Sequence, residues 1–292
     1  MLLTGDLGFS AIEPFAAAFP ERFFNVGVAE QNMVGVATGL AEAGFVPFVY
    51  SIATFATRRP YEFLVNGPLR HELPVRLIGI GGGFDYGHAG PTHHATDDVA
   101  LMRAQPGVCV IVPADHEQAV KALRHTWDRA GPVYYRLGKD DAPVVPGLRG
   151  AFELGRAQRL GDRGGQPGQP VILAMGSVAG EAASAADELA RRGLDTSVLV
   201  VASVRPAPAD DIAAALRHAP LALTVEAHSV DGGLGSLVAE IIAERGLPCR
   251  LVRCGMRSTP AGVSGSQGYW LRTHGLSRDA LVEQVMTSLG PV

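Results

Sequence analysis

One carboxylate lies alone in an apolar stretch near the start of the chain. From Phe23 to Leu40 the sequence reads FFNVGVAEQNMVGVATGL, and Glu30 is its only charged residue. An ionised carboxylate in apolar surroundings is costly unless something there uses it. Such a group can hold or move a proton on a bound molecule. It can also cap a helix by accepting from the first backbone N–H groups, and residue type alone leaves both roles open.

The residues around Glu30 predict the elements that position it. Apolar residues recur after it at helical spacing: Met33, Val34, Val36, Ala37 and Leu40. The segment 26–28 before it has the character of the end of a buried strand. Glu30 is therefore predicted at a strand-to-helix turn, where α/β proteins place ligand-contacting residues.

Apolar runs rich in β-branched residues alternate with helix-like segments along the whole chain. The predicted strands are 46–50, 75–80, 108–112, 133–136, 171–175, 196–201, 221–225 and 250–253, and the clearest helices are 180–192, 210–217 and 234–245. This alternation predicts mostly parallel sheets covered by helices. The segment KDDAPVVPGLRG after residue 138 predicts an exposed connection. We therefore predict two doubly wound α/β domains, at residues 1–139 and 150–292.

The composition of the chain indicates which kinds of partner it binds. The chain has 292 residues, 47% of them hydrophobic, and a net charge of −4 without a basic stripe. This balance argues against nucleic acid or a membrane as the main partner. The three cysteines have no CxxC spacing, and no apolar segment approaches the length of a bilayer span. We expect a cytoplasmic protein that acts on small molecules.

Several ordered motifs carry a resemblance to one family. They are GVAEQNMVGVATGLAEAGFVPFV, SIATFATRR, GPTHH followed by DDVALMR, VPAD, GPVYYR, AMGSVAGEA, VRPAPADDI and VEAHSVDGGLGS. Together they resemble the transketolase family of thiamine-diphosphate enzymes over nearly the whole chain. The resemblance implies a pyrimidine-binding domain followed by the family's C-terminal domain.

Two family motifs are missing from the sequence. Family members hold the cofactor's diphosphate and its Mg²⁺ through a GDG motif and a paired-asparagine segment of an N-terminal domain, and this chain contains neither. The resemblance therefore implies the C-terminal subunit of a split transketolase. Thiamine diphosphate would be shared with a separate N-terminal subunit, which would bind the Mg²⁺, and the expected assembly is an α2β2 heterotetramer acting on a sugar or sugar phosphate.

The resemblance also implies roles for individual residues. Glu30 would hydrogen-bond the aminopyrimidine of the cofactor and so activate it, and Phe55 would pack against that ring. Tyr61 is expected to border the same pocket. His93 of GPTHH would position substrate oxygens and assist proton transfer, a task that suits an imidazole. The alternative for Phe55 is a purely structural role in the hydrophobic core.

Anion contacts are expected from four further residues. Arg136, which ends GPVYYR, matches a family arginine that grips the substrate phosphate, and a guanidinium suits such bidentate binding. Arg58, with Arg59 beside it, could add a second contact, and Ser10 falls near a family phosphate contact. A metal cluster is an alternative, since His93 and Asp97 would face each other across a helical turn and His88, His94 and Asp98 lie close in the sequence.

Two departures from the family pattern concern the substrate. Ala89 stands where transketolases have an acidic residue, and glycines at 81–83 stand where they have a phosphate-binding histidine. A different sugar, modified or unphosphorylated, is therefore expected.

Three alternatives remain open for the whole chain. They are a 2-oxo acid dehydrogenase β subunit, a carboligase like deoxyxylulose-phosphate synthase, and a non-catalytic scaffold. The segment DGGLGS at 231–236 could cradle a nucleotide phosphate, but its spacing favours a tight turn with close helix packing.

Overall fold

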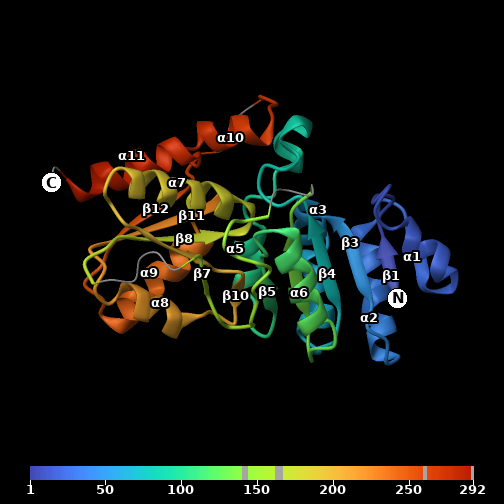
Figure 1. Ribbon diagram of the computed structural model, residues 1–292. Coiled ribbons are helices and arrows are strands. Elements are labelled where there is room, and N and C mark those ends of the chain that lie inside the picture. Colours follow the sequence, from blue (N-terminus) through green and yellow to red (C-terminus); the bar gives the residue numbers. More distant parts are fainter. Residues whose placement is uncertain (140–143, 162–166, 259–261, 291–292) are drawn as a thin grey trace.

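The computed structural model describes residues 1–139, 144–161, 167–258 and 262–290. Its elements form two sheets that lie side by side, each covered by helices (Figure 1). The two sheets are mostly parallel, as the alternating pattern predicts, and the predicted α/β fold is confirmed. Among the described residues no helix is both long and apolar enough to cross a membrane.

The first sheet has seven strands in the order β10-β5-β6-β4-β3-β1-β2. These strands are β1 (Leu2–Thr4), β2 (Phe23–Asn25), β3 (Phe48–Ile52), β4 (Arg76–Ile80), β5 (Cys109–Ile111), β6 (Val133–Leu137) and β10 (Ser203–Arg205). Only β10 runs antiparallel to its neighbour, β5. Because β10 comes from the second half of the sequence, this strand ties the two halves together.

The first sheet is accompanied by helices from the same half of the chain. The α-helices are α1 (Glu13–Ala18), α2 (Glu30–Glu42), α3 (Ala53–Arg58), α4 (Tyr61–Leu64), α5 (Asp98–Arg103) and α6 (His116–Thr126). Shorter helical turns are η1 (Pro20–Arg22), η2 (Val65–Leu69), η3 (Gly87–Ala89) and η4 (Pro91–His93). The buried residues of α2 include Met33, Val34 and Ala37, which carry the predicted helical spacing.

The second sheet has five strands in the order β12-β11-β8-β9-β7. Its strands are β7 (Gln158–Arg159), β8 (Val171–Met175), β9 (Ser197–Val200), β11 (Leu221–Ser229) and β12 (Arg250–Met256). Its helices are η5 (Gly176–Val178), α7 (Ala179–Arg191), α8 (Ala209–Leu216), α9 (Leu234–Arg245), α10 (Gln267–Thr273) and α11 (Arg278–Leu289). Figure 1 shows α7 and α11 on one side of this sheet, with α8 and α9 on the other. Strand β8 is buried along its whole length because helices cover both faces.

Two local expectations were wrong. The strand before Glu30 ends at Asn25 and not at 28, because the chain turns at Gly27, whose φ of +73° suits glycine. In the connection between the halves, Val145 and Leu148 are buried and not exposed, since they join the apolar cluster that contains Phe84. Residues 140–143 of that connection, and residues 162–166 before β8, lie outside the described residues.

Candidate functional site

A short hydrogen-bonded loop places Glu30 at the start of α2. The side-chain oxygen of Asn25 accepts from the backbone N–H of Asp6 at 3.1 Å and of Gly27 at 3.0 Å. These contacts tie the end of β2 to the loop after β1. The strand-to-helix position predicted for Glu30 is therefore confirmed, and its side chain is held at the edge of the first sheet.

The Glu30 carboxylate is buried, and its contacts are to side chains. Only 2% of the residue is exposed. The hydroxyl of Ser51 donates to Oε1 at 3.1 Å, and Nη1 of Arg59 lies 3.0 Å from Oε1 and 2.9 Å from Oε2. The N-cap of α2 is Ala29, without a side-chain cap, so the capping alternative does not describe how this carboxylate is used. A buried carboxylate held by a hydroxyl and a cation is arranged for hydrogen bonding.

Phe55 and His93 lie beside the Glu30–Arg59 pair. The guanidinium carbon of Arg59 is 3.9 Å from the centroid of the Phe55 ring, a cation–π contact. The His93 ring meets the same phenylalanine edge-on, with centroids 5.0 Å apart. Phe55 is half-buried, so one part of its ring remains accessible. The structure thus brings together three residues that the motifs single out.

The residues of the metal alternative have other partners. Nδ1 of His93 lies 2.9 Å from the hydroxyl of Thr92. Asp97, the other half of the metal alternative, is paired with Arg58, with 2.8 Å between Oδ1 and Nη2. Within the described ranges there is no group of three or more His, Cys, Asp or Glu side chains that could hold a metal ion.

Arg136 lies in the interior and does not line an open site. It is 5% exposed, and its Nε donates to the buried carboxylate of Asp98 at 2.8 Å. Its Nη2 donates to the backbone oxygens of Ala95 and Ala227, at 2.9 and 3.0 Å. This placement gives no support to the expected phosphate contact, because the guanidinium is used to join the two halves of the chain.

Asp98 is also held by Tyr134, whose hydroxyl donates to Oδ2 at 2.6 Å. Burial, and then the neighbouring Asp98 carboxylate, raises the pKa of Tyr134 well above its usual value. Tyr134 therefore keeps its proton as a donor to Asp98. The Asp98 group is a buried polar network that fixes the start of α5, close after His93 in the sequence.

The remaining site residues contact other neighbours. The Tyr61 hydroxyl donates to the backbone oxygen of Leu101 at 3.1 Å and accepts from Gln105 at 2.6 Å. Ser10 is exposed in the turn before α1, where its backbone N–H donates to Glu13 at 2.7 Å. Neither contact connects these residues to the Glu30 group.

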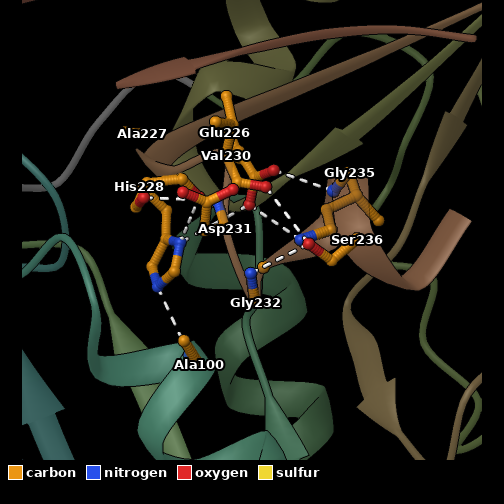
Figure 2. A network of polar contacts seen from close by, with 12 residues as sticks. Ala100, Glu226, Ala227, His228, Val230, Asp231, Gly232, Gly235 and Ser236 are labelled. Atoms are coloured by element: carbon orange, nitrogen blue, oxygen red, sulfur yellow. Dashed lines mark hydrogen bonds and ion pairs between the residues drawn. The ribbon is translucent and has the colours of Figure 1, made fainter. Parts of the chain in front are cut away.

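A third buried carboxylate, after those of Glu30 and Asp98, organises the junction near α5 (Figure 2). Glu226 accepts from the backbone N–H groups of Leu234 and Gly235 at 2.7 and 2.8 Å, at the start of α9. A Cβ atom on Gly233 would lie 1.9 Å from its Oε2. The segment 231–236 is thus a tight turn packed against a buried side chain, as its spacing favours, and the chain's own carboxylate occupies the place that a nucleotide phosphate would need.

His228 extends this junction to α5. Its Nε2 accepts from the backbone N–H of Ala100 at 3.4 Å, and its Nδ1 lies 2.7 Å from the Ser229 oxygen, as Figure 2 shows. Arg103 donates to the Gly232 oxygen at 2.8 Å. The C-terminal half therefore supports the element that follows the His93 loop, a role that sequence motifs did not reveal.

An aromatic cluster with two histidines underlies the His93 loop. Phe84 stacks on His274, with centroids 5.0 Å apart, and meets His94 edge-on at 5.4 Å. Trp270 lies 5.2 Å from His94. Burial lowers the pKa of both His94 and His274 from the ordinary value. Both rings are therefore held neutral in the folded protein near neutral pH.

We expect this cluster to weaken the fold in mild acid. Since the folded-state pKa of His94 and His274 is lowered, the unfolded chain takes up protons first as the pH falls below about 6.5, and stability is lost in that direction. His274→Phe keeps the stack on Phe84 and removes one titrating ring, so it should lose less stability between pH 7.5 and 5.5. Urea unfolding at both pH values measures this, with the exposed His71→Gln as control; equal losses in both variants would contradict it.

The two halves of the chain match two family models. Residues 2–144 match the family described as "Transketolase, pyrimidine binding domain", and residues 167–281 match "Transketolase, C-terminal domain". A protein of Methanocaldococcus jannaschii described as a transketolase C-terminal section is 34% identical over 99% of this chain and 90% of that protein. One of the subunits of an apulose-4-phosphate transketolase from Actinobacillus succinogenes is 33% identical, over 94% of this chain and 88% of that polypeptide.

A solved structure and part of a longer enzyme also match. The structure titled "Split gene transketolase, inactive beta4 tetramer" has a TM-score of 0.85 and 35% identity, and the match covers 98% of this chain and 90% of that one. A 1-deoxy-D-xylulose-5-phosphate synthase from Syntrophotalea carbinolica is 34% identical over 85% of this chain, but over only 38% of that enzyme. The two curated relatives and the solved structure that match over about nine-tenths of their own length are thus described as sections, subunits or split-gene forms of transketolases.

Proposed function

Since this chain belongs to the transketolase family, with its pyrimidine-binding and C-terminal domains in one polypeptide, we propose that it is the C-terminal subunit of a thiamine-diphosphate-dependent transketolase. The reaction is transfer of a two-carbon ketol unit from a ketose or ketose phosphate to an aldose. The observation that carries this proposal is the buried Glu30 carboxylate beside the Phe55 ring. We propose that the two domains span residues 1–139 and 150–292.

The Glu30 group fits an aminopyrimidine ring. A planar group with N–H donors, the guanidinium of Arg59, already lies on Phe55 and against both oxygens of Glu30. An aminopyrimidine is likewise flat and offers polar ring nitrogens, so the same aromatic face and carboxylate suit it. When bound, thiamine diphosphate supplies the nucleophilic carbon that carries the two-carbon unit.

The chain's own residues then have separate tasks. Glu30 holds a proton at a ring nitrogen, in a site where burial strengthens its hydrogen bond. Phe55 fixes the plane of the ring. His93, whose ring lies 5.0 Å from Phe55, orients substrate oxygens and moves a proton.

We propose that a separate N-terminal subunit completes the site. The segment leading to Glu30 exposes apolar side chains, with Phe24 40% and Val28 69% exposed. Exposed apolar residues beside a candidate site support the docking of another polypeptide. That subunit would carry the GDG and paired-asparagine segments, hold the diphosphate and Mg²⁺, and form an α2β2 assembly. The similar split-gene protein described as an inactive β4 tetramer supports a need for the partner.

The substrate we propose is a modified or unphosphorylated sugar. A Cβ atom on Gly81 would lie 2.1 Å from the Tyr86 ring, so Tyr86 fills the space that a histidine side chain at 81 would require. The Tyr86 ring is 6.3 Å from that of His93. On this side of the site Tyr86, whose ring centroid lies 5.3 Å from Nζ of Lys139, takes the place of the histidine expected in the family, and Ala89 takes the place of the acid.

Reconstitution tests the function. We expect ketol transfer only when the chain is combined with a separately expressed N-terminal subunit that carries the GDG motif, ideally the product of a neighbouring gene. The chain alone should show no ketol-transfer activity. Ketol transfer without any partner would overturn the split-enzyme proposal. Release of CO₂ from pyruvate faster than ketol transfer would favour a deoxyxylulose-phosphate-synthase-like or 2-oxo acid dehydrogenase activity. No cofactor binding by the pair would favour a scaffold.

A further inference from the structure

The side chain of Arg59 makes the two contacts that the proposed function gives to the cofactor's pyrimidine ring. Its guanidinium carbon lies 3.9 Å from the Phe55 centroid. Its Nη1 reaches both Glu30 oxygens, at 3.0 and 2.9 Å. One flat group thus covers the aromatic face and contacts both carboxylate oxygens, and a second flat group cannot take the same place at the same time.

The ion pair is strongly asymmetric in its burial. The side chain of Glu30 is 2% exposed, whereas that of Arg59 is 42% exposed. A buried carboxylate without a partner is costly, so Glu30 needs a donor whenever the site holds no other one. The Arg59 guanidinium itself needs little desolvation energy and can move into water once another donor contacts Glu30, because 42% of its side chain is already exposed.

The place of Arg59 in the fold also permits this movement. Arg59 is the C-cap of α3, directly after the helix that carries Phe55. Its neighbour Arg58 is separately paired with Asp97 at 2.8 Å. A change of side-chain rotamer can therefore clear the Phe55 face while the helix and the Arg58 contact stay in place.

We propose that Arg59 is a displaceable placeholder that closes the pyrimidine site of this subunit until the cofactor ring takes over its contacts with Glu30 and Phe55. The inference rests on the proposed function and adds a regulation of the same site. The Glu30–Arg59 pair must break when the cofactor binds. We therefore expect the free energy of that pair to weaken cofactor binding.

The test measures cofactor binding and does not depend on turnover. Thiamine diphosphate with excess Mg²⁺ is titrated calorimetrically into the reconstituted complex, with wild-type chain, Arg59→Ala, Arg59→Gln and, as a control, the exposed Arg70→Gln. We expect Arg59→Ala to lower the dissociation constant by about tenfold, which equals about 1.4 kcal/mol. Arg59→Gln should shift it in the same direction by less, and Arg70→Gln should leave it unchanged.

A second readout uses the isolated chain. We expect Arg59→Ala to lower its melting temperature, because Glu30 then lacks its cation, and Glu30→Gln added to Arg59→Ala to restore most of the loss. Arg59→Gln keeps a donor for Glu30 and so covers the case in which Arg59→Ala does not fold.

The outcomes separate the two proposals. A wild-type complex that does not bind thiamine diphosphate would overturn the proposed function, and the placeholder with it. A wild-type complex that binds, while the Arg59 variants bind more weakly or equally, would overturn the placeholder alone, and weaker binding would make Arg59 a direct ligand of the cofactor.

Discussion

Glu30→Gln should abolish most of the ketol transfer of the reconstituted enzyme while leaving the fold intact. The amide is nearly the same size as the carboxylate, and its one oxygen can still accept from Ser51 and Arg59, although the second contact of Arg59, with Oε2, is lost. It cannot hold or release the proton that the proposed role requires. Since a positioned acid–base group typically contributes about 10²–10⁴-fold, we expect the turnover rate to fall by that amount.

The control is a matched substitution on the same helix. Glu42 ends α2 and is exposed, so Glu42→Gln should leave turnover unchanged. Circular dichroism and melting temperature establish that both variants are folded, and steady-state assays with the partner present give the rates. Unchanged transfer by folded Glu30→Gln would favour the scaffold alternative, because a non-catalytic subunit has no need of the carboxylate.

Periodicity predicted the fold well where long apolar segments dominate. Strand β8 and helix α9 have the predicted bounds, because each is a buried element with an uninterrupted pattern. Strands β1 and β10 were not predicted, and β2 was placed too far along the chain, since each has only three residues and its partners are distant in sequence. Tertiary pairing, more than local propensity, defines such short strands.

In the candidate site, too, the sequence revealed residues that stand in a local motif but not their partners from distant parts of the chain. Glu30, Phe55 and His93 were identifiable because each stands in its own motif. Their partners were less visible: nothing near Glu30 in the sequence points to Ser51, and nothing near Arg136 points to Asp98. A side-chain pair that joins two elements leaves no periodic signal in the sequence. The sequence therefore could not show that Arg136 has a buried partner, and the resemblance alone suggested a phosphate contact for it.

Replacing Arg136 by methionine should therefore destabilise the protein strongly. Arg136 and Asp98 are both buried, and their side chains are 4% and 0% exposed. Removing the cation leaves the Asp98 carboxylate uncompensated, a loss of about 3–5 kcal/mol in comparable buried pairs. Denaturant unfolding of the isolated chain measures this. Arg136→Met combined with Asp98→Asn should recover most of the loss, because it removes both charges and keeps an acceptor for Tyr134.

An exposed pair provides the matched comparison for this effect. Arg156 lies 2.8 Å from Asp211, but its side chain is 58% exposed, so Arg156→Met should change stability only slightly. A substrate-binding role for Arg136 makes the opposite prediction: stability would be kept, and the KM for a phosphorylated sugar would rise in the reconstituted enzyme. Finding that pattern would return Arg136 to the substrate site and would require the Asp98 pair to open when substrate binds.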